Sequence, residues 1–284
     1  MGVRSPVRKK IQGIVYHILM ILLCIVMIYP ILWLVSASFK SQSEVIHSPG
    51  NLIPHDVVFT NYADGWRGFG NNTFAVFFKN SFIVVTLSTF FQTISSIFVA
   101  FGFARTRFKG QRLMFSIMIV TMLLPSQIML IPQYLIMNKL NWLDTYLPLL
   151  VPTLFGLPFF IFMIMQFIQG LPRELDEAAE IDGCNIYDIF FRIILPLLKP
   201  AVITVVIFAF YWKWQEFLEP MLYLQKANRY TVPIAMKLFS DPSSVTNWGS
   251  IYAMSVLSMV PVFLIFVFFQ KYLVEGIATT GLKS

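Results

Sequence analysis

Charged residues are scarce in this sequence, and so are the residues that usually bind metals or form disulfides. Only 12% of the 284 residues are Asp, Glu, Lys or Arg, whereas 57% are hydrophobic, a balance far outside that of soluble proteins. The two cysteines and three histidines are scattered, which argues against a disulfide framework or a metal site. We therefore predict an integral membrane protein without a metal site.

Several motifs that carry chemistry are also absent. The sequence has no G-x-x-x-x-G-K-[ST] phosphate loop, no Gly-x-Ser-x-Gly elbow, no His-Glu-x-x-His and no intramembrane pair of aspartates. We therefore predict that the chain is not an enzyme, that it holds no cofactor, and that any energy it uses comes from elsewhere. No arginine-rich block or aromatic-basic motif for nucleic acid occurs either.

Long uncharged apolar runs dominate what is present. Six of them reach the roughly 20 residues that a helix needs to cross a bilayer. The first run is longer than the apolar part of a secretory signal, so we expect a retained membrane helix there. Prolines inside several runs are expected to kink the helices and not to end them, because neighbouring helices satisfy the freed carbonyls. The runs are residues 11–38, 81–104, 113–138, 145–171, 201–225 and 248–270.

The distribution of the basic residues sets the expected orientation. With the N-terminus in the cytoplasm, thirteen of the 21 Lys and Arg residues fall in cytoplasmic segments and seven fall outside. The short loop Arg105–Arg112 shows the bias most clearly. We therefore predict a multi-pass protein with both termini in the cytoplasm, and nucleic acid is not needed to explain the basic balance.

One stretch is an island of charge, with six acids and three bases in residues 170–200. We call it the central segment. Its first half predicts a short helix over residues 173–182, ended by Gly183 in a left-handed conformation. Asn185 is expected to cap a second helix with Asp188 in the capping-box position. The segment is either an amphipathic loop at the lipid surface or a docking element, and its acids favour a basic protein groove.

The central segment also carries a family resemblance. Glu177-Ala178-Ala179, then Gly183, then Ile193-x-Leu195-Pro196 resembles the cytoplasmic EAA signature of permease subunits of bacterial ABC importers. Other fragments resemble the carbohydrate branch of that family, in particular the shorter permease related to the maltose system. They are Tyr29-Pro30, Ser38-Phe39-Lys40, Asn80-Ser81, Ala104-Arg105, Asp144-Thr145, Trp214-x-Glu216-Phe217-Leu218-x-Pro220 and Gln270-Lys271-Tyr272. Asp64-Gly65-Trp66 and the C-terminal tail look nearest to importers of pectin-derived oligosaccharides.

The resemblance implies a fold and a set of partners. The fold is the type I importer permease fold, a single domain over residues 1–284 with six transmembrane helices and a cytoplasmic coupling loop. The partners are a second homologous permease, two ATPase subunits that hold ATP and Mg, and an extracytoplasmic sugar-binding protein, in a bacterial cell membrane. By resemblance, Glu177 enters an ATPase cleft, and alternating access moves the sugar. The implied coupling residues are Glu177, Ala178, Ala179, Asp182, Gly183, Ile193, Leu195 and Pro196.

Ionisable residues inside the fifth run suggest a second site. Trp212, Lys213, Trp214 and Glu216 are candidates for lining a sugar pathway, because charges in a span are costly and usually functional. In that pathway the tryptophans would stack on sugar rings, and Lys213 with Glu216 would meet hydroxyls or an acidic sugar. The alternative is an internal pair between Lys213 and Glu216, charges that reach the outer headgroups and tryptophans of an aromatic belt. For Glu219 we favour that alternative. An ion-coupled secondary transporter is the other functional hypothesis, but the first four runs contain no acid.

Overall fold

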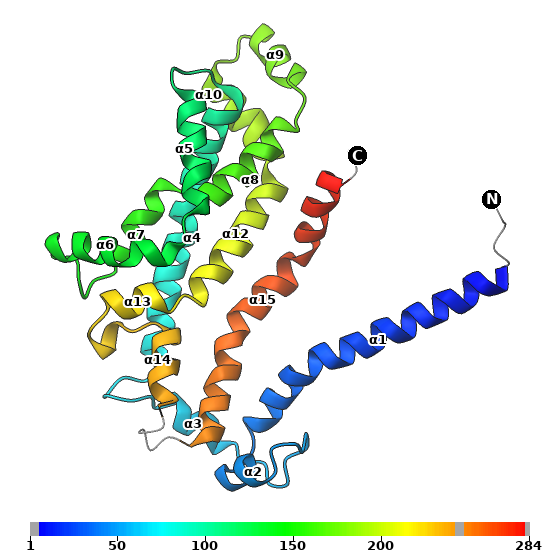
Figure 1. Cartoon of the computed structure of the whole chain (residues 1–284), viewed down its shortest axis with the longest axis vertical. Coiled ribbons are helices and arrows are strands. Elements are labelled where there is room, and N and C mark those ends of the chain that lie inside the picture. The colour runs from blue at the N-terminus through cyan, green and yellow to red at the C-terminus, as the bar shows by residue number, and fades with distance from the viewer. Residues whose placement is uncertain (1–5, 242–246, 282–284) are drawn as a thin grey trace. The chain divides into compact units, whose positions relative to one another are not determined.

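A computed structural model describes the backbone of residues 6–241 and 247–281, and the side chains of residues 12–241 and 247–271. Every regular element in these residues is a helix, which confirms the predicted all-α class (Figure 1). In chain order the elements are α1 (Pro6–Ala37), α2 (Gln42–His47), α3 (Thr60–Trp66), α4 (Phe74–Arg105), α5 (Gln111–Leu123), α6 (Ser126–Lys139), α7 (Leu147–Leu150), η1 (Val151–Phe155), α8 (Pro158–Gln169), α9 (Glu174–Ile181), α10 (Ile186–Asp188), η2 (Ile189–Ile194), α11 (Leu195–Leu197), α12 (Lys199–Trp214), α13 (Leu218–Tyr223), η3 (Ala227–Arg229), α14 (Val232–Phe239) and α15 (Trp248–Gly281).

The helices of the described residues supply up to six membrane spans, in agreement with the predicted number. Four segments are long and apolar enough to cross a bilayer alone, and two bent pairs qualify when each pair is taken as one span. The single segments are Gln12–Ala37, Phe74–Arg105, Leu147–Gln169 and Trp248–Lys271. The bent pairs are Gln111–Leu123 with Ser126–Lys139, at 103°, and Ile186–Leu197 with Lys199–Trp214, at 71°.

The prolines do not all behave as predicted. Pro30 and Pro261 lie inside continuous helices, as expected. Pro125 and Pro158, in contrast, start new helices, so the prediction of kinks without ends was wrong at these positions. The residue before each of these two prolines has an extended backbone, because the proline ring clashes with a helical conformation there.

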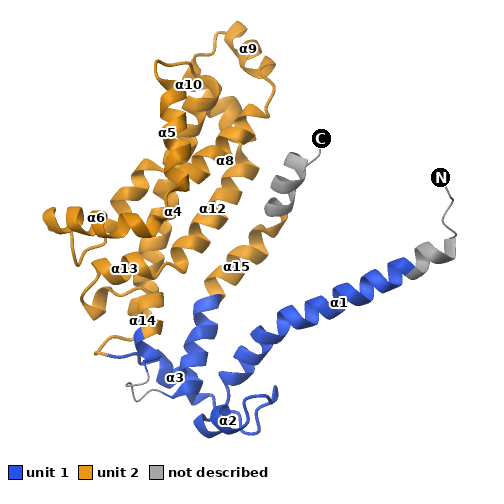
Figure 2. Cartoon of the chain, in the orientation of Figure 1, with its two compact units in different colours: residues 1–69, 238–259 blue, residues 70–237, 260–284 orange. Residues whose placement is uncertain are grey.

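The chain divides into two compact units, which are coloured separately in Figure 2. The first comprises residues 1–69 and 238–259, and the second comprises residues 70–237 and 260–284.

Buried polar side chains organise the turn after α1 in the first unit. Lys40 is only 1% exposed, and its ammonium group donates to the carbonyls of Ser48 and Asn51. The buried amide of Asn61 donates to the carbonyls of Ser38, at 2.9 Å, and Lys40, at 2.8 Å. Because buried polar groups are stable only when they are hydrogen-bonded, these contacts give the Ser38-Phe39-Lys40 motif a structural role.

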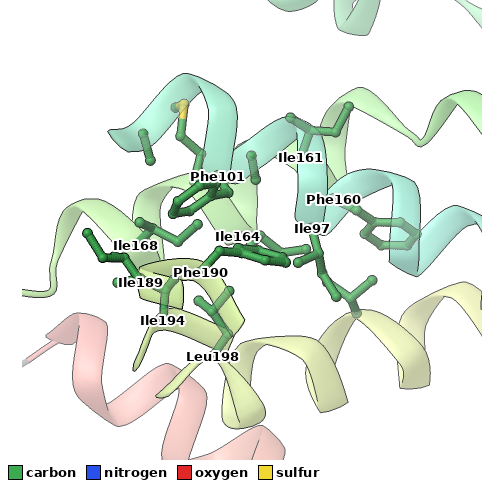
Figure 3. Packing of buried hydrophobic residues seen from close by; sticks show 14 of the residues in the cluster. Ile97, Phe101, Phe160, Ile161, Ile164, Ile168, Ile189, Phe190, Ile194 and Leu198 are labelled. Carbon is green, nitrogen blue, oxygen red and sulfur yellow. The ribbon is translucent and has the colours of Figure 1, made fainter. Parts of the chain in front are cut away.

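The core of the second unit is built around α4. This helix packs most extensively against α8 and then against α12. The close packing brings branched and aromatic side chains from all three helices and from η2 into one apolar cluster (Figure 3). The labelled members are Ile97, Phe101, Phe160, Ile161, Ile164, Ile168, Ile189, Phe190, Ile194 and Leu198.

Serines of α4 compensate for the irregular backbone of the fourth span. Ser88 and Ser95 donate to the carbonyls of Leu149 and Leu154, where α7 and η1 depart from regular helix geometry. Ser96 accepts a hydrogen bond from the backbone of Leu157 at 3.3 Å, just before α8 begins. Since the bilayer core offers no water to such groups, these bonds allow a broken helix at this place.

A charged clamp holds two loops of the second unit together. The Asp144 carboxylate accepts the backbone N–H groups of Gln225 and Lys226, both at 3.2 Å. It also pairs with the ammonium group of Lys226 at 3.3 Å and with the guanidinium of Arg229 at 3.4 Å. Burial raises the pKa of Asp144, but these donors outweigh it and hold the pKa below its ordinary value.

The clamp predicts a pH-dependent loss of stability. Because the folded-state pKa of Asp144 is lowered, its stabilising contribution is present above about pH 4 and is lost as the pH falls through that lowered value. We expect Asp144→Asn to reduce stability at pH 7 by about 1 to 2 kcal/mol, since it removes charge-assisted bonds. Asparagine also tolerates the φ of +56° at this position. Thermal unfolding in detergent should show a melting-temperature gap from wild type that shrinks toward pH 3. A gap that stays constant with pH would contradict the prediction.

Candidate functional site

The central segment folds largely as its local sequence predicts. The predicted helix is confirmed as α9, and three acids lie in its first turn. Gly183 follows it with a φ of +81°, a left-handed conformation that glycine adopts without steric cost. The capping box is also present. The Asn185 side chain accepts from the backbone of Asp188 at 3.0 Å, and the Asp188 carboxylate accepts from the backbone of Asn185 at 3.4 Å.

The predicted coupling residues divide into an exposed group and an inward group. Ala179 is only 6% exposed and belongs to the core cluster, against which Ile193 and Leu195 also pack. The residues of the other group present the outer surface of α9 and the turns beside it. They are Glu177 and Ala178 on α9 and Asp182 and Gly183 in the turn after it; Pro196 is exposed as well, but in α11. One part of the motif therefore attaches the segment to the protein, and the other part is free to meet a partner.

Two apolar side chains on this surface were missed in the sequence. Ile181 is 87% exposed and Tyr187 is 72% exposed. Since successive helix residues are 100° apart, Ile181 lies on the same outward face of α9 as Glu177 and Ala178. The sequence did contain an indication of this exposed position. Ile181 ends an acidic helix and does not lie on the side of that helix where Ala179 is buried.

A single ion pair connects α9 to the end of α4. The Arg105 side chain is only 4% exposed, and its Nε lies 2.9 Å from Oδ2 of Asp176. The distance defines an ion pair, although Nε–H is not aligned on the carboxylate as a hydrogen bond. Nη2 of Arg105 donates to the Leu171 carbonyl at 3.0 Å. Besides the packing of Ala179 in the core cluster, α9 is thus tied to the central helix of its unit by the Arg105 side chain, whose role the sequence did not reveal.

A second candidate site is a cavity of about 850 Å³ in the same unit, which we call the polar cavity. Three interruptions of the spans meet at it: the α5–α6 corner, the turn before α8, and residues 215–217 between α12 and α13. The predicted fifth run, residues 201–225, is therefore divided. Irregular backbone at membrane depth is tolerated only where it is buried in protein or lines a water-filled space, so the breaks make this cavity a candidate functional site. Its lining is Gln92, Ser126, Gln127, Leu130, Leu157, Trp212, Lys213, Gln215, Glu216, Phe217, Leu218 and Glu219.

Three charged side chains of the cavity form one cluster. Nζ of Lys213 lies 2.7 Å from Oε2 of Glu216 and 3.7 Å from Oε2 of Glu219. The pair of Lys213 with Glu216 is the internal pair considered from the sequence. The contact with Glu219 and the cavity around all three show that these charges face an internal space.

The two tryptophans of the candidate pathway have different surroundings. Trp212 is 39% exposed, lines the polar cavity, and stacks against Phe160 with ring centroids 5.2 Å apart. Trp214 is only 5% exposed and stacks on Phe210 at 5.6 Å, near Phe82 at 5.0 Å. The structure therefore brings Trp212, Lys213 and Glu216 to the cavity and places Trp214 in an aromatic cluster outside its lining.

Gln92 is a cavity residue that the sequence did not single out. It lies on α4 and is only 6% exposed, yet its amide makes no hydrogen bond to any part of the chain that the structure describes. The amide atoms of Gln92 are not among the described side-chain atoms that are sealed from water without a partner, so the amide opens on the cavity and is available to a bound molecule. A lone glutamine in the second apolar run was the signal that could have identified it.

The spans, the polar cavity and the exposed charged helix together define a membrane transport protein. Residues 92–279 match the family described as "Binding-protein-dependent transport system inner membrane component", and the chain belongs to this family. The predicted family of importer permeases is thereby confirmed, and a transport permease is not an enzyme. The finer resemblance to importers of pectin-derived sugars remains a prediction.

Individual relatives match over almost their whole length. The chain is 32% identical to the arabinooligosaccharides transport system permease protein AraQ of Bacillus subtilis over 283 residues, covering 99% of both chains. It is 32% identical over 285 residues to the trehalose/maltose transport system permease protein MalG of Thermococcus litoralis, again covering 99% of both. A solved bacterial ABC transporter involved in import of the acidic polysaccharide alginate is similar in fold, with a TM-score of 0.79, 23% identity, and coverage of 96% of this chain and 99% of that one.

Proposed function

We propose that this chain is a permease subunit of an ATP-driven importer, and that it moves a carbohydrate into the cytoplasm by alternating access. One observation carries the proposal: the central segment presents an exposed acidic helix that is ion-paired to the helix at the centre of the unit that holds the polar cavity. A transport subunit whose energy comes from ATP hydrolysis in another subunit needs a surface where that subunit docks. It also needs a structural connection from that surface to the solute pathway.

We assign the docking element to the outward face of α9. Glu177 supplies the negative charge for a basic cleft, while Ala178 allows a close approach of the partner surface. Ile181 and Tyr187 add exposed apolar area, the kind of side chain that anchors an interface when it enters a pocket. The partner that fits is an ATPase subunit, which would hold ATP and Mg in place of this chain.

We assign the connection to the ion pair of Arg105 with Asp176 and to α4. From Arg105 to Gln92, α4 covers thirteen residues, or roughly 20 Å at the helical rise per residue. A displacement of α9 is therefore passed by Arg105 to a rigid helix, and Gln92 carries it into the cavity lining. ATP-driven approach of two ATPase subunits would move this element and its counterpart in a second permease subunit.

We assign the pathway to the polar cavity. The open part of Trp212 offers an aromatic surface for a sugar ring, and Gln92 offers hydrogen bonds to hydroxyls. The relatives whose names mention arabinooligosaccharides, trehalose and maltose support a carbohydrate cargo. The distribution of basic residues supports an orientation with both termini in the cytoplasm. In a bacterial cell membrane, α9 would then face the ATPases, and an external binding protein would deliver the sugar.

The test is a measurement on the complete transporter. The complex, isolated through a tag on this chain, should contain a second permease and an ATPase. The sugar-binding protein either co-purifies with it or is added afterwards. We expect its ATPase activity in proteoliposomes to rise several-fold with loaded binding protein, accompanied by sugar accumulation. Isolation of this chain without an ATPase, together with uptake that depends on an ion gradient and not on ATP, would overturn the proposal in favour of a secondary transporter.

A further inference from the structure

We propose that the polar cavity admits uncharged sugars and excludes sugars that carry a carboxylate. The inference rests on the proposed function, because it concerns what passes through the pathway. It runs against the resemblance to importers of pectin-derived oligosaccharides wherever those sugars contain uronic acid units, which carry carboxylates. The fold alone does not set this property, since the alginate importer, which handles an acidic polysaccharide, shares the fold.

The cavity has no free positive charge to offer a sugar carboxylate. Among its described lining residues Lys213 is the only Lys, Arg or His, and it contacts two carboxylates. Glu216 occupies its ammonium group at 2.7 Å, and Glu219 approaches it to 3.7 Å. At pH 8, the pH of the experiment below, all three groups are ionised, and one ammonium against two carboxylates gives the cluster a net charge of −1.

The cluster is also largely shielded from water, so solvent screens its net negative charge only weakly. The side chains of Lys213, Glu216 and Glu219 are 17%, 23% and 29% exposed. Charges in a partly dry protein interior interact several times more strongly than in bulk water. A carboxylated sugar would therefore meet repulsion from Glu219 without an ion pair that offsets its loss of hydration.

The remaining polar groups suit a neutral sugar. Gln92 lines the cavity, and its amide, which makes no hydrogen bond within the described residues, can both donate to and accept from hydroxyls. Ser126 and Gln127 at the start of α6 add further uncharged groups. Trp212, stacked on Phe160 on one side, presents its remaining surface to the cavity.

The experiment uses Trp212 as a reporter in the complete, tagged transporter at pH 8, with and without a non-hydrolysable ATP analogue. The fluorescence of Trp212 is obtained by subtracting the emission of the Trp212→Phe variant from that of the protein that retains Trp212. The probes are two disaccharides with the same linkage, neutral α-1,4-galactobiose and digalacturonate, together with the quenchers acrylamide and iodide. Glu219→Gln is the test variant. Asp64→Asn is the matched control, because it removes one exposed carboxylate that does not line the cavity.

We expect galactobiose and acrylamide to change Trp212 emission, and digalacturonate and iodide to act at least about tenfold more weakly. Glu219→Gln should strengthen the effects of digalacturonate and iodide several-fold, whereas Asp64→Asn should not. The inference would be overturned if digalacturonate acted on the wild type as strongly as galactobiose or more strongly, or if Glu219→Gln changed nothing. The assignment of the sugar pathway to the polar cavity would be unaffected by either result. Acrylamide quenching with no response to either disaccharide would overturn it as well. No quenching of Trp212 by acrylamide in either nucleotide state would overturn both the inference and the pathway assignment.

Discussion

Glu177→Lys is expected to abolish sugar uptake while the chain still folds and enters the membrane. Glu177 is exposed at the surface of α9 and makes no ion pair with any described part of its own chain, so its removal costs the fold little. In a docked complex, a reversed charge faces a basic cleft, and removing one partner of a buried interfacial charge pair typically costs about 2 to 5 kcal/mol. A loss of about 3 kcal/mol corresponds to roughly a hundredfold lower affinity for the ATPase. Co-purification of the ATPase and uptake into proteoliposomes measure both effects.

The matched control is Glu180→Lys on the same helix. It makes the same change of charge at an exposed position, but Glu180 lies beside the line from Glu177 to Ile181, on the flank of α9 opposite Ala178. We expect Glu180→Lys to retain most of the uptake. Equal losses in both variants would mean that only the overall charge of the segment matters. Full activity of Glu177→Lys would remove α9 from the docking site.

The second large effect is expected at the ion pair between Arg105 and Asp176. Replacing Arg105 by leucine leaves a partly covered carboxylate without its counter-ion and frees the Leu171 carbonyl. Breaking such a pair typically costs about 3 kcal/mol or more. If the pair transmits motion, the variant should keep its ATPase and continue to hydrolyse ATP, but it should transport at least about tenfold less sugar per ATP. The ratio of sugar to ATP is the decisive measurement, because a merely less stable complex would lose both activities together.

Charge exchange gives this prediction its control. Arg105→Asp and Asp176→Arg should each uncouple transport, and the double variant should recover part of the sugar-to-ATP ratio because it rebuilds the pair. Recovery should be incomplete, since an aspartate at position 105 cannot donate to the Leu171 carbonyl. A double variant that transports less than both single variants, or single variants with an unchanged ratio, would contradict the transmission role.

The sequence by itself determined the features that depend on local physics. Uncharged runs of bilayer length predicted the spans, because a helix satisfies its own backbone hydrogen bonds in lipid. Within the central segment, Gly183 and the box of Asn185 with Asp188 predicted both helix boundaries, because capping involves residues only a few positions apart. The family signature lies in the same short stretch, which is why the resemblance could be recognised before the structure.

Only the tertiary structure decided which residues meet. Pro30 and Pro125 look alike in sequence, but α1 continues through Pro30 whereas the chain turns by 103° next to Pro125. Trp212 and Trp214 are two residues apart, so they point in different directions on α12, and packing decided that Trp212 lines the cavity. Arg105 and Asp176 are 71 residues apart in the sequence, and Gln92 is likewise distant from Lys213. Local sequence patterns do not predict contacts between such distant residues. The sequence thus determined that the chain crosses a membrane and carries a short acidic helix, whereas long-range packing decided which residue of α4 that helix contacts and which charges the cavity contains.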